Sequence, residues 1–63
     1  MTIVSHCEVF ETKAGQQMFI ERYVDKPFFK SFWRYGFIYS SGGIVHKDML
    51  TSKPNKKRLI EKY

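Results

Sequence analysis

Aromatic and basic side chains are interleaved in one stretch of this 63-residue chain, from Lys26 to Tyr39. The stretch holds seven of the eleven aromatic residues together with Lys26, Lys30 and Arg34, and no acidic residue interrupts it. Aromatic rings stack on nucleic-acid bases, and lysine and arginine contact phosphates. This composition predicts a binding surface for nucleic acid, the hydrophobic core of a small domain, or both, and the sequence leaves these alternatives open.

The charges of the chain are unevenly distributed along its length. The net charge is +5, but residues 1–25 carry −2 and residues 26–63 carry +7. A basic region predicts a polyanionic partner, which could be nucleic acid, an anionic membrane surface or an acidic protein surface, although excess charge also keeps a small protein soluble. No apolar run approaches the ~18 residues that a membrane span requires, so we expect no membrane partner.

Four segments of the chain alternate between two sets of side chains with a period of two residues, as strands do. These segments are 3–11, 18–24, 32–40 and 44–50. Gly15 marks the turn after the first segment, because glycine adopts the positive φ angles that tight turns need. Gly42 and Gly43 mark the turn after the third. We therefore predict two hairpins that form a small antiparallel sheet of about four strands.

Two further segments have helical features. The residues after Asp25 predict a single helical turn over 27–31, because their aromatic side chains have helical spacing. Residues 55–63 predict a short C-terminal helix with Thr51 or Ser52 as its N-cap. A helix this short is marginal alone, so we expect it either to dock on the sheet through its apolar edge or to fray. The predicted fold class is α+β, in one domain over residues 1–63.

The third predicted strand, 32–40, carries aromatic side chains on both faces. Its Tyr-Gly-Phe-Ile at 35–38 resembles the Gly-Phe-Ile centre of the ribonucleoprotein motif of cold-shock domains, and Ile-Val-His at 44–46 is similar to the end of the second motif. This local similarity in chemistry covers about twenty residues. Trp33 and Arg34 stand where that family has Lys and Gly, and the link between the motifs is shorter. The residues that the resemblance nominates for base stacking are Tyr35, Phe37 and His46.

The basic C-terminal segment adds groups that contact phosphates in a salt-dependent way. Combined with the aromatic strand, it predicts a small basic nucleic-acid-binding protein. An alternative is a protein-binding regulator or inhibitor, since aromatic and arginine side chains also dominate protein interfaces. The predicted nucleic-acid-binding residues are Lys30, Trp33, Arg34, Tyr35, Phe37, His46, Lys53, Lys56, Lys57 and Arg58.

Groups suited to catalysis or metal binding are few. His6, Cys7 and His46 would meet only if the first and fourth strands were neighbours, and their spacing matches no metal motif. His6 and Cys7 are adjacent, so in a strand they point to opposite faces. We therefore predict no enzymatic activity, no metal site and no cofactor.

The single cysteine, Cys7, excludes a disulfide within the chain. A lone thiol and the lack of a signal peptide predict a cytoplasmic protein. A domain of this length buries only about 60% of the surface that its unfolded chain exposes, so its stability is marginal. Oligomerisation often compensates, and a homodimer that buries part of the aromatic surface is expected.

Overall fold

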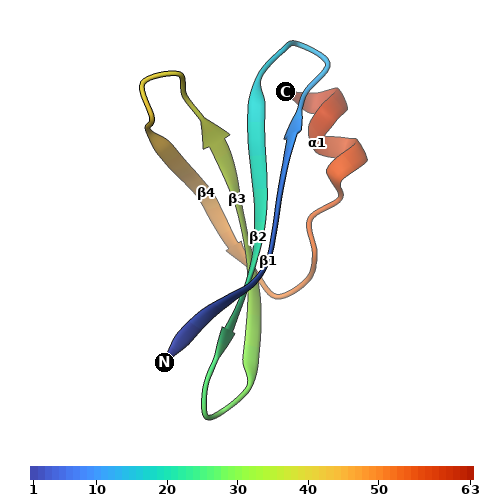
Figure 1. The fold of residues 1–63 in the computed structure, drawn as a ribbon. Helices are drawn as coiled ribbons and strands as arrows, with labels where there is room; N and C mark the ends of the chain where they lie inside the picture. Colours follow the sequence, from blue (N-terminus) through green and yellow to red (C-terminus); the bar gives the residue numbers. More distant parts are fainter.

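The structure, a computed structural model of residues 1–63, is a four-stranded antiparallel sheet followed by one helix (Figure 1). The strand order is β1-β2-β3-β4, so every strand pairs with the next one in the chain. The predicted α+β fold is confirmed, and a third hairpin, between β2 and β3, joins the two that were expected. The elements are β1 (Thr2–Glu11), β2 (Gln17–Asp25), β3 (Lys30–Ile38), β4 (Ile44–Leu50) and α1 (Lys56–Lys62).

The turn between β1 and β2 is held by its own backbone and by one side chain. The Thr12 N–H donates to the Gln16 carbonyl at 2.8 Å, and Thr12 Oγ1 accepts from the Gln16 N–H at 3.0 Å. Gly15 has a φ of 84°, in the left-handed region where a residue without a Cβ is favoured. The turn predicted at Gly15 is confirmed.

The connection between β2 and β3 differs from the expectation of a helical turn over 27–31. Residues 26–29 form a turn, and β3 begins at Lys30, two residues before the predicted strand. Asp25 pairs with Lys30 across the hairpin, so the ladder continues up to the turn and leaves no room for a helix. Phe28 and Phe29 are therefore exposed at the tip of this hairpin.

The helix begins later than the predicted cap, Thr51 or Ser52. Asn55 is the N-cap, and its Oδ1 accepts a hydrogen bond from the Arg58 N–H at 3.2 Å. A helix capped by Thr51 or Ser52 would need helical backbone at Lys53, which the following Pro54 disfavours. Asn55 is the first residue after the proline whose side chain is well suited to cap.

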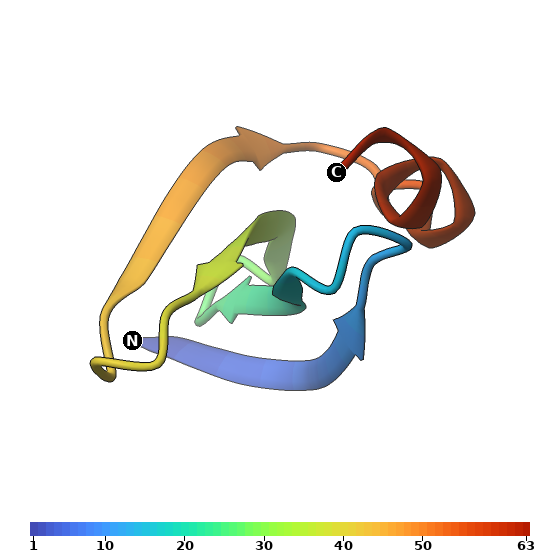
Figure 2. The same cartoon turned by 90° about the horizontal axis from the view of Figure 1, so that it is seen from above.

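The two faces of the sheet have different surroundings. Directly paired residues point to the same side, so the register defines two sets of side chains. We call the side on which α1 packs the helix face, and the other side the open face; Figure 2 shows α1 beside the sheet, near the β1–β2 turn. The helix face presents Phe10, Met18, Ile20, Trp33, Tyr35 and Phe37. The open face presents Val4, Cys7, Val9, Phe19, Glu21, Tyr23, Asp25, Lys30, Phe32, Arg34, Ile44, His46 and Met49.

The main core cluster lies on the helix face, under α1, and Phe19 is buried on the open face. Phe10, Met18 and Ile20 form a buried cluster with Leu59, the only buried residue of α1. The Lys13 N–H donates to the Ile60 carbonyl at 2.9 Å, which ties the helix to the β1–β2 turn. These contacts hold the helix in place against the ends of β1 and β2.

Gly36 permits an unusually close approach between β3 and β4. Tyr35 pairs with Asp48 but Gly36 pairs with His46, so Lys47 is an extra residue in β4, a β-bulge. A Cβ on Gly36 would lie 1.8 Å from the Val45 carbonyl oxygen. Only glycine fits here.

Candidate nucleic-acid interface

Three aromatic residues of the predicted nucleic-acid-binding set lie on the helix face. Trp33, Tyr35 and Phe37 alternate along β3, as the sequence predicted, and all three are half-buried against the core cluster. Each ring therefore contributes to the core and also keeps part of its surface in solvent. The two alternatives left open by the sequence, core and exposed surface, both apply to these side chains.

Lysine ammonium groups lie over rings of the helix face and of α1. In five lysine–ring pairs, Nζ is 5.2–5.8 Å from the ring centroid, within the range of cation–π attraction. The four lysines come from β4, the β4–α1 connection and α1. The pairs are Lys47 with Phe37 and Tyr63, Lys53 with Trp33, Lys56 with Phe10, and Lys62 with Tyr63.

None of the lysine or arginine side chains is neutralised by an ion pair. The structure contains two salt bridges, between the N-terminal amine and Asp25 at 3.8 Å and between His6 and Glu8 at 3.5 Å. Neither involves a lysine or arginine side chain. The positive charge of α1 and of the connection before it is therefore available to an anionic ligand.

An open hollow of about 650 Å³ lies between α1 and the sheet. Tyr35 and Leu50 line it from the strands, and Arg58 and Lys62 line it from the helix, together with Glu61. The volume falls within the range of small-ligand sites. The hollow brings the predicted residues Tyr35 and Arg58 to one place, and Lys57 is exposed on the same helix.

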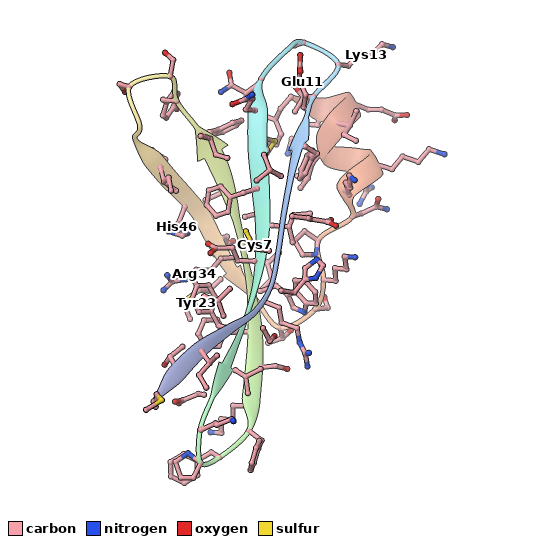
Figure 3. The ribbon with its side chains drawn as sticks, viewed as in Figure 1. Cys7, Glu11, Lys13, Tyr23, Arg34 and His46 are labelled. Atoms are coloured by element: carbon pink, nitrogen blue, oxygen red, sulfur yellow. The ribbon has the colours of Figure 1, made fainter.

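The remaining predicted residues lie elsewhere. Figure 3 shows Arg34 and His46 on the side of the sheet away from α1. The Arg34 guanidinium carbon is 5.0 Å from the Tyr23 ring centroid, and the His46 ring meets the edge of Phe19 at 5.3 Å. Lys30 lies at the start of β3, beside the β2–β3 turn and far from α1 (Figure 1). The predicted site is therefore divided between two faces and one end of the sheet.

The residues considered for a metal site, His6, Cys7 and His46, do not lie together. β1 and β4 are the two outer strands, so His46 is not beside Cys7. His6 packs on Trp33 on the helix face at 5.9 Å, and the exposed Cys7 is on the open face. No group of three His, Cys, Asp or Glu side chains is placed to hold a metal ion. The one helix is too short and too polar to cross a membrane.

Comparisons of the chain with known proteins identify no relative. No family model, curated protein or solved structure matches the chain. The resemblance of residues 35–38 to the cold-shock motif thus remains local, and the site is interpreted from its own geometry.

Two cationic residues of this surface, Lys47 and Lys62, were not among the predicted site residues. Lys47 reaches the helix face at the β-bulge opposite Gly36, where its Nζ lies over Phe37. Lys62 lies in the last turn of α1, and its partner Tyr63 packs edge-on against Phe37 at 5.0 Å. The four-residue spacing from Leu59 to Tyr63 is the signal in the sequence that places this ring on the apolar side of the helix.

On the open face, one tyrosine has a perturbed pKa. Burial raises the pKa of Tyr23 above its ordinary value of 10.0, and the neighbouring Glu21 carboxylate raises it further. The Tyr23 hydroxyl donates to Glu21 Oε1 at 3.1 Å, while the nearby Arg34 opposes the increase. These three groups form a polar cluster in the middle of the open face.

Proposed function

We propose that the protein binds nucleic acid through the helix face and α1. The observation that carries the proposal is that lysines with no acidic partner lie over half-buried aromatic rings. Phosphates would draw these ammonium groups away from the rings, and bases could then stack on the exposed parts of the rings. The proposal describes a binding protein of the cytoplasm, not an enzyme.

Phosphate contacts should supply most of the affinity. Trp33, Tyr35 and Phe37 are half-buried, so each offers less stacking surface than a fully displayed ring. The lysines and Arg58, in contrast, are exposed and contact backbone phosphates without regard to sequence. We therefore expect low sequence specificity and a strong dependence on salt.

The test compares two charge-matched variants in gel-shift titrations with single- and double-stranded oligonucleotides at several salt concentrations. Lys53→Gln with Lys56→Gln removes two cations from the proposed surface. Lys26→Gln with Lys30→Gln removes two cations from the far end of the molecule. On single strands, the first pair should reduce the log–log salt slope by about 1.4, at roughly 0.7 per phosphate contact, and the second should leave it unchanged.

A ring variant separates stacking from charge. Trp33→Leu should lower the affinity and leave the salt slope unaltered, since no phosphate contact is removed. If the unmodified protein binds no oligonucleotide at low salt, the proposal is wrong. The basic surface would then fit an acidic protein partner, and the alternative of a protein-binding regulator takes its place.

A further inference from the structure

The open face of the sheet carries many apolar side chains, and α1 does not pack on it. Four of its aliphatic side chains are exposed, and the rings of Tyr23 and Phe32 stack at 5.4 Å beside them. α1 packs on the opposite face (Figure 2). These exposed residues lie on the two outer strands of one face, on either side of the Glu21–Arg34 pair, and apolar side chains exposed together in this way favour an interface. The four exposed residues are Val4, Val9, Ile44 and Met49.

Charges on the open face are arranged so that the face complements itself. In the central row of the sheet, Glu21 on β2 pairs with Arg34 on β3. Asp25 on β2 pairs with Lys30 on β3 in the same way, at the end of the hairpin. Acidic groups therefore lie on β2 and basic groups on β3, on either side of the midline of the sheet.

We propose that the open face binds the open face of a second copy, forming a two-fold symmetric dimer with its axis parallel to the strands. β2 then lies over β3 of the partner, and Glu21 faces the partner's Arg34. An axis across the strands would place Glu21 opposite the same residue of the other copy, and the repulsion disfavours it. The proposal is independent of the nucleic-acid surface, because both helix faces stay exposed.

The area of the face is sufficient for a stable contact. Four strands, of which β2 and β3 have nine residues each, present a face of roughly 19 by 30 Å. Two such faces bury on the order of 1,100 Å² in total, which exceeds the ~1,000 Å² expected of a specific interface. Sheets that stack face to face keep their strands within about 30° of each other, so the central rows overlap best.

The central row supplies a direct test by cross-linking. It runs Cys7, Glu21, Arg34, Met49 across the four strands, so Cys7 faces the partner's Met49 in the proposed dimer. The variant Met49→Cys, treated with a short bifunctional thiol cross-linker, should give a covalent dimer of two 7.5 kDa chains on a denaturing gel. A spacer is needed because stacked sheets lie about 10 Å apart, whereas a disulfide spans about 7 Å between Cα atoms.

The matched control is Val45→Cys, which is also exposed on β4 but points to the helix face through its pairing with Phe37. It should yield no more covalent dimer than the unmodified chain. Equal cross-linking of the two variants would overturn the proposed arrangement.

A second test uses the paired charges and sedimentation at micromolar concentration. Glu21→Arg and Arg34→Glu should each weaken the dimer about tenfold or more, because each creates two like-charge contacts. An equimolar mixture of the two variants should recover the dimer, since every contact across the interface is again between opposite charges. Circular dichroism checks that each variant is folded. The proposal fails if the unmodified protein sediments as a 7.5 kDa species or if the mixture stays as monomeric as its components.

Discussion

Replacing Gly36 by alanine should detach β4 from the sheet. The new Cβ would lie 1.8 Å from the Val45 oxygen, whereas ordinary contact begins at about 3.4 Å. The strand would have to retreat by about 1.6 Å, and a hydrogen bond of normal length, near 2.9 Å, does not survive this displacement. Every residue of β4 except the half-buried Leu50 is exposed, so few side-chain contacts oppose its release.

The expected loss of stability is large for a chain of this size. Overfilling a close contact costs about 1–3 kcal/mol, and each lost ladder hydrogen bond costs about 0.5–1.5 kcal/mol. With two bonds broken, the loss is about 2–6 kcal/mol. The whole free energy of unfolding for 63 residues is about 3–9 kcal/mol, so the variant should be severely destabilised or largely unfolded at 25 °C.

Urea unfolding followed by circular dichroism measures this loss, with Gly43→Ala as the control. Gly43 has a negative φ, and a Cβ there would meet its nearest atoms, in Ser41 and Tyr39, at 3.8 and 3.9 Å. The control should change stability by no more than about 0.5 kcal/mol. If the two variants unfold at the same urea concentration, the close approach at Gly36 does not have the role assigned to it.

Three further outcomes are expected. Leu59→Ala should lower the free energy of unfolding by about 2–5 kcal/mol in the same assay, because it empties the only buried position of α1. Asn55→Ala should cost about 1 kcal/mol through loss of the cap on the Arg58 N–H, and Asn55→Asp should restore most of it. The folded state holds the Tyr23 proton more tightly than the unfolded state, so stability should be complete below pH 10 and fall as the pH rises through the raised pKa. Tyr23→Phe should reduce this fall, as measured by urea unfolding over a pH series.

Local pattern was sufficient to predict the strands and the turn at Gly15. Alternation of side chains and the glycine positions follow from backbone geometry, which neighbouring residues determine. The start of β3 could not be predicted in this way, because the aromatic spacing of 28–32 fits a helix as well as a strand. The strand forms because Asp25 pairs with Lys30 across the hairpin, a contact that the local sequence pattern does not contain.

The division of the predicted site has a different cause. Both faces of the sheet carry apolar side chains, so the sequence could not show which face α1 would cover. Alternation within β3 did predict that Arg34 and Trp33 point to opposite faces of the sheet. Placing both in one site assumed that a single ligand could reach both faces. The β-bulge at Lys47 depends on the close approach of β4 to Gly36, and no pattern within β4 alone indicates it.

The order of the strands also bears on how quickly the protein folds. Each strand joins its successor through a turn of four or five residues, so every ladder grows outward from a short loop that is cheap to close. Docking of α1 is the exception, because it brings Ile60 to Lys13. The hairpins should therefore be formed in the folding transition state while the helix is still free. Truncating Leu59 would then accelerate unfolding and leave the folding rate almost unchanged.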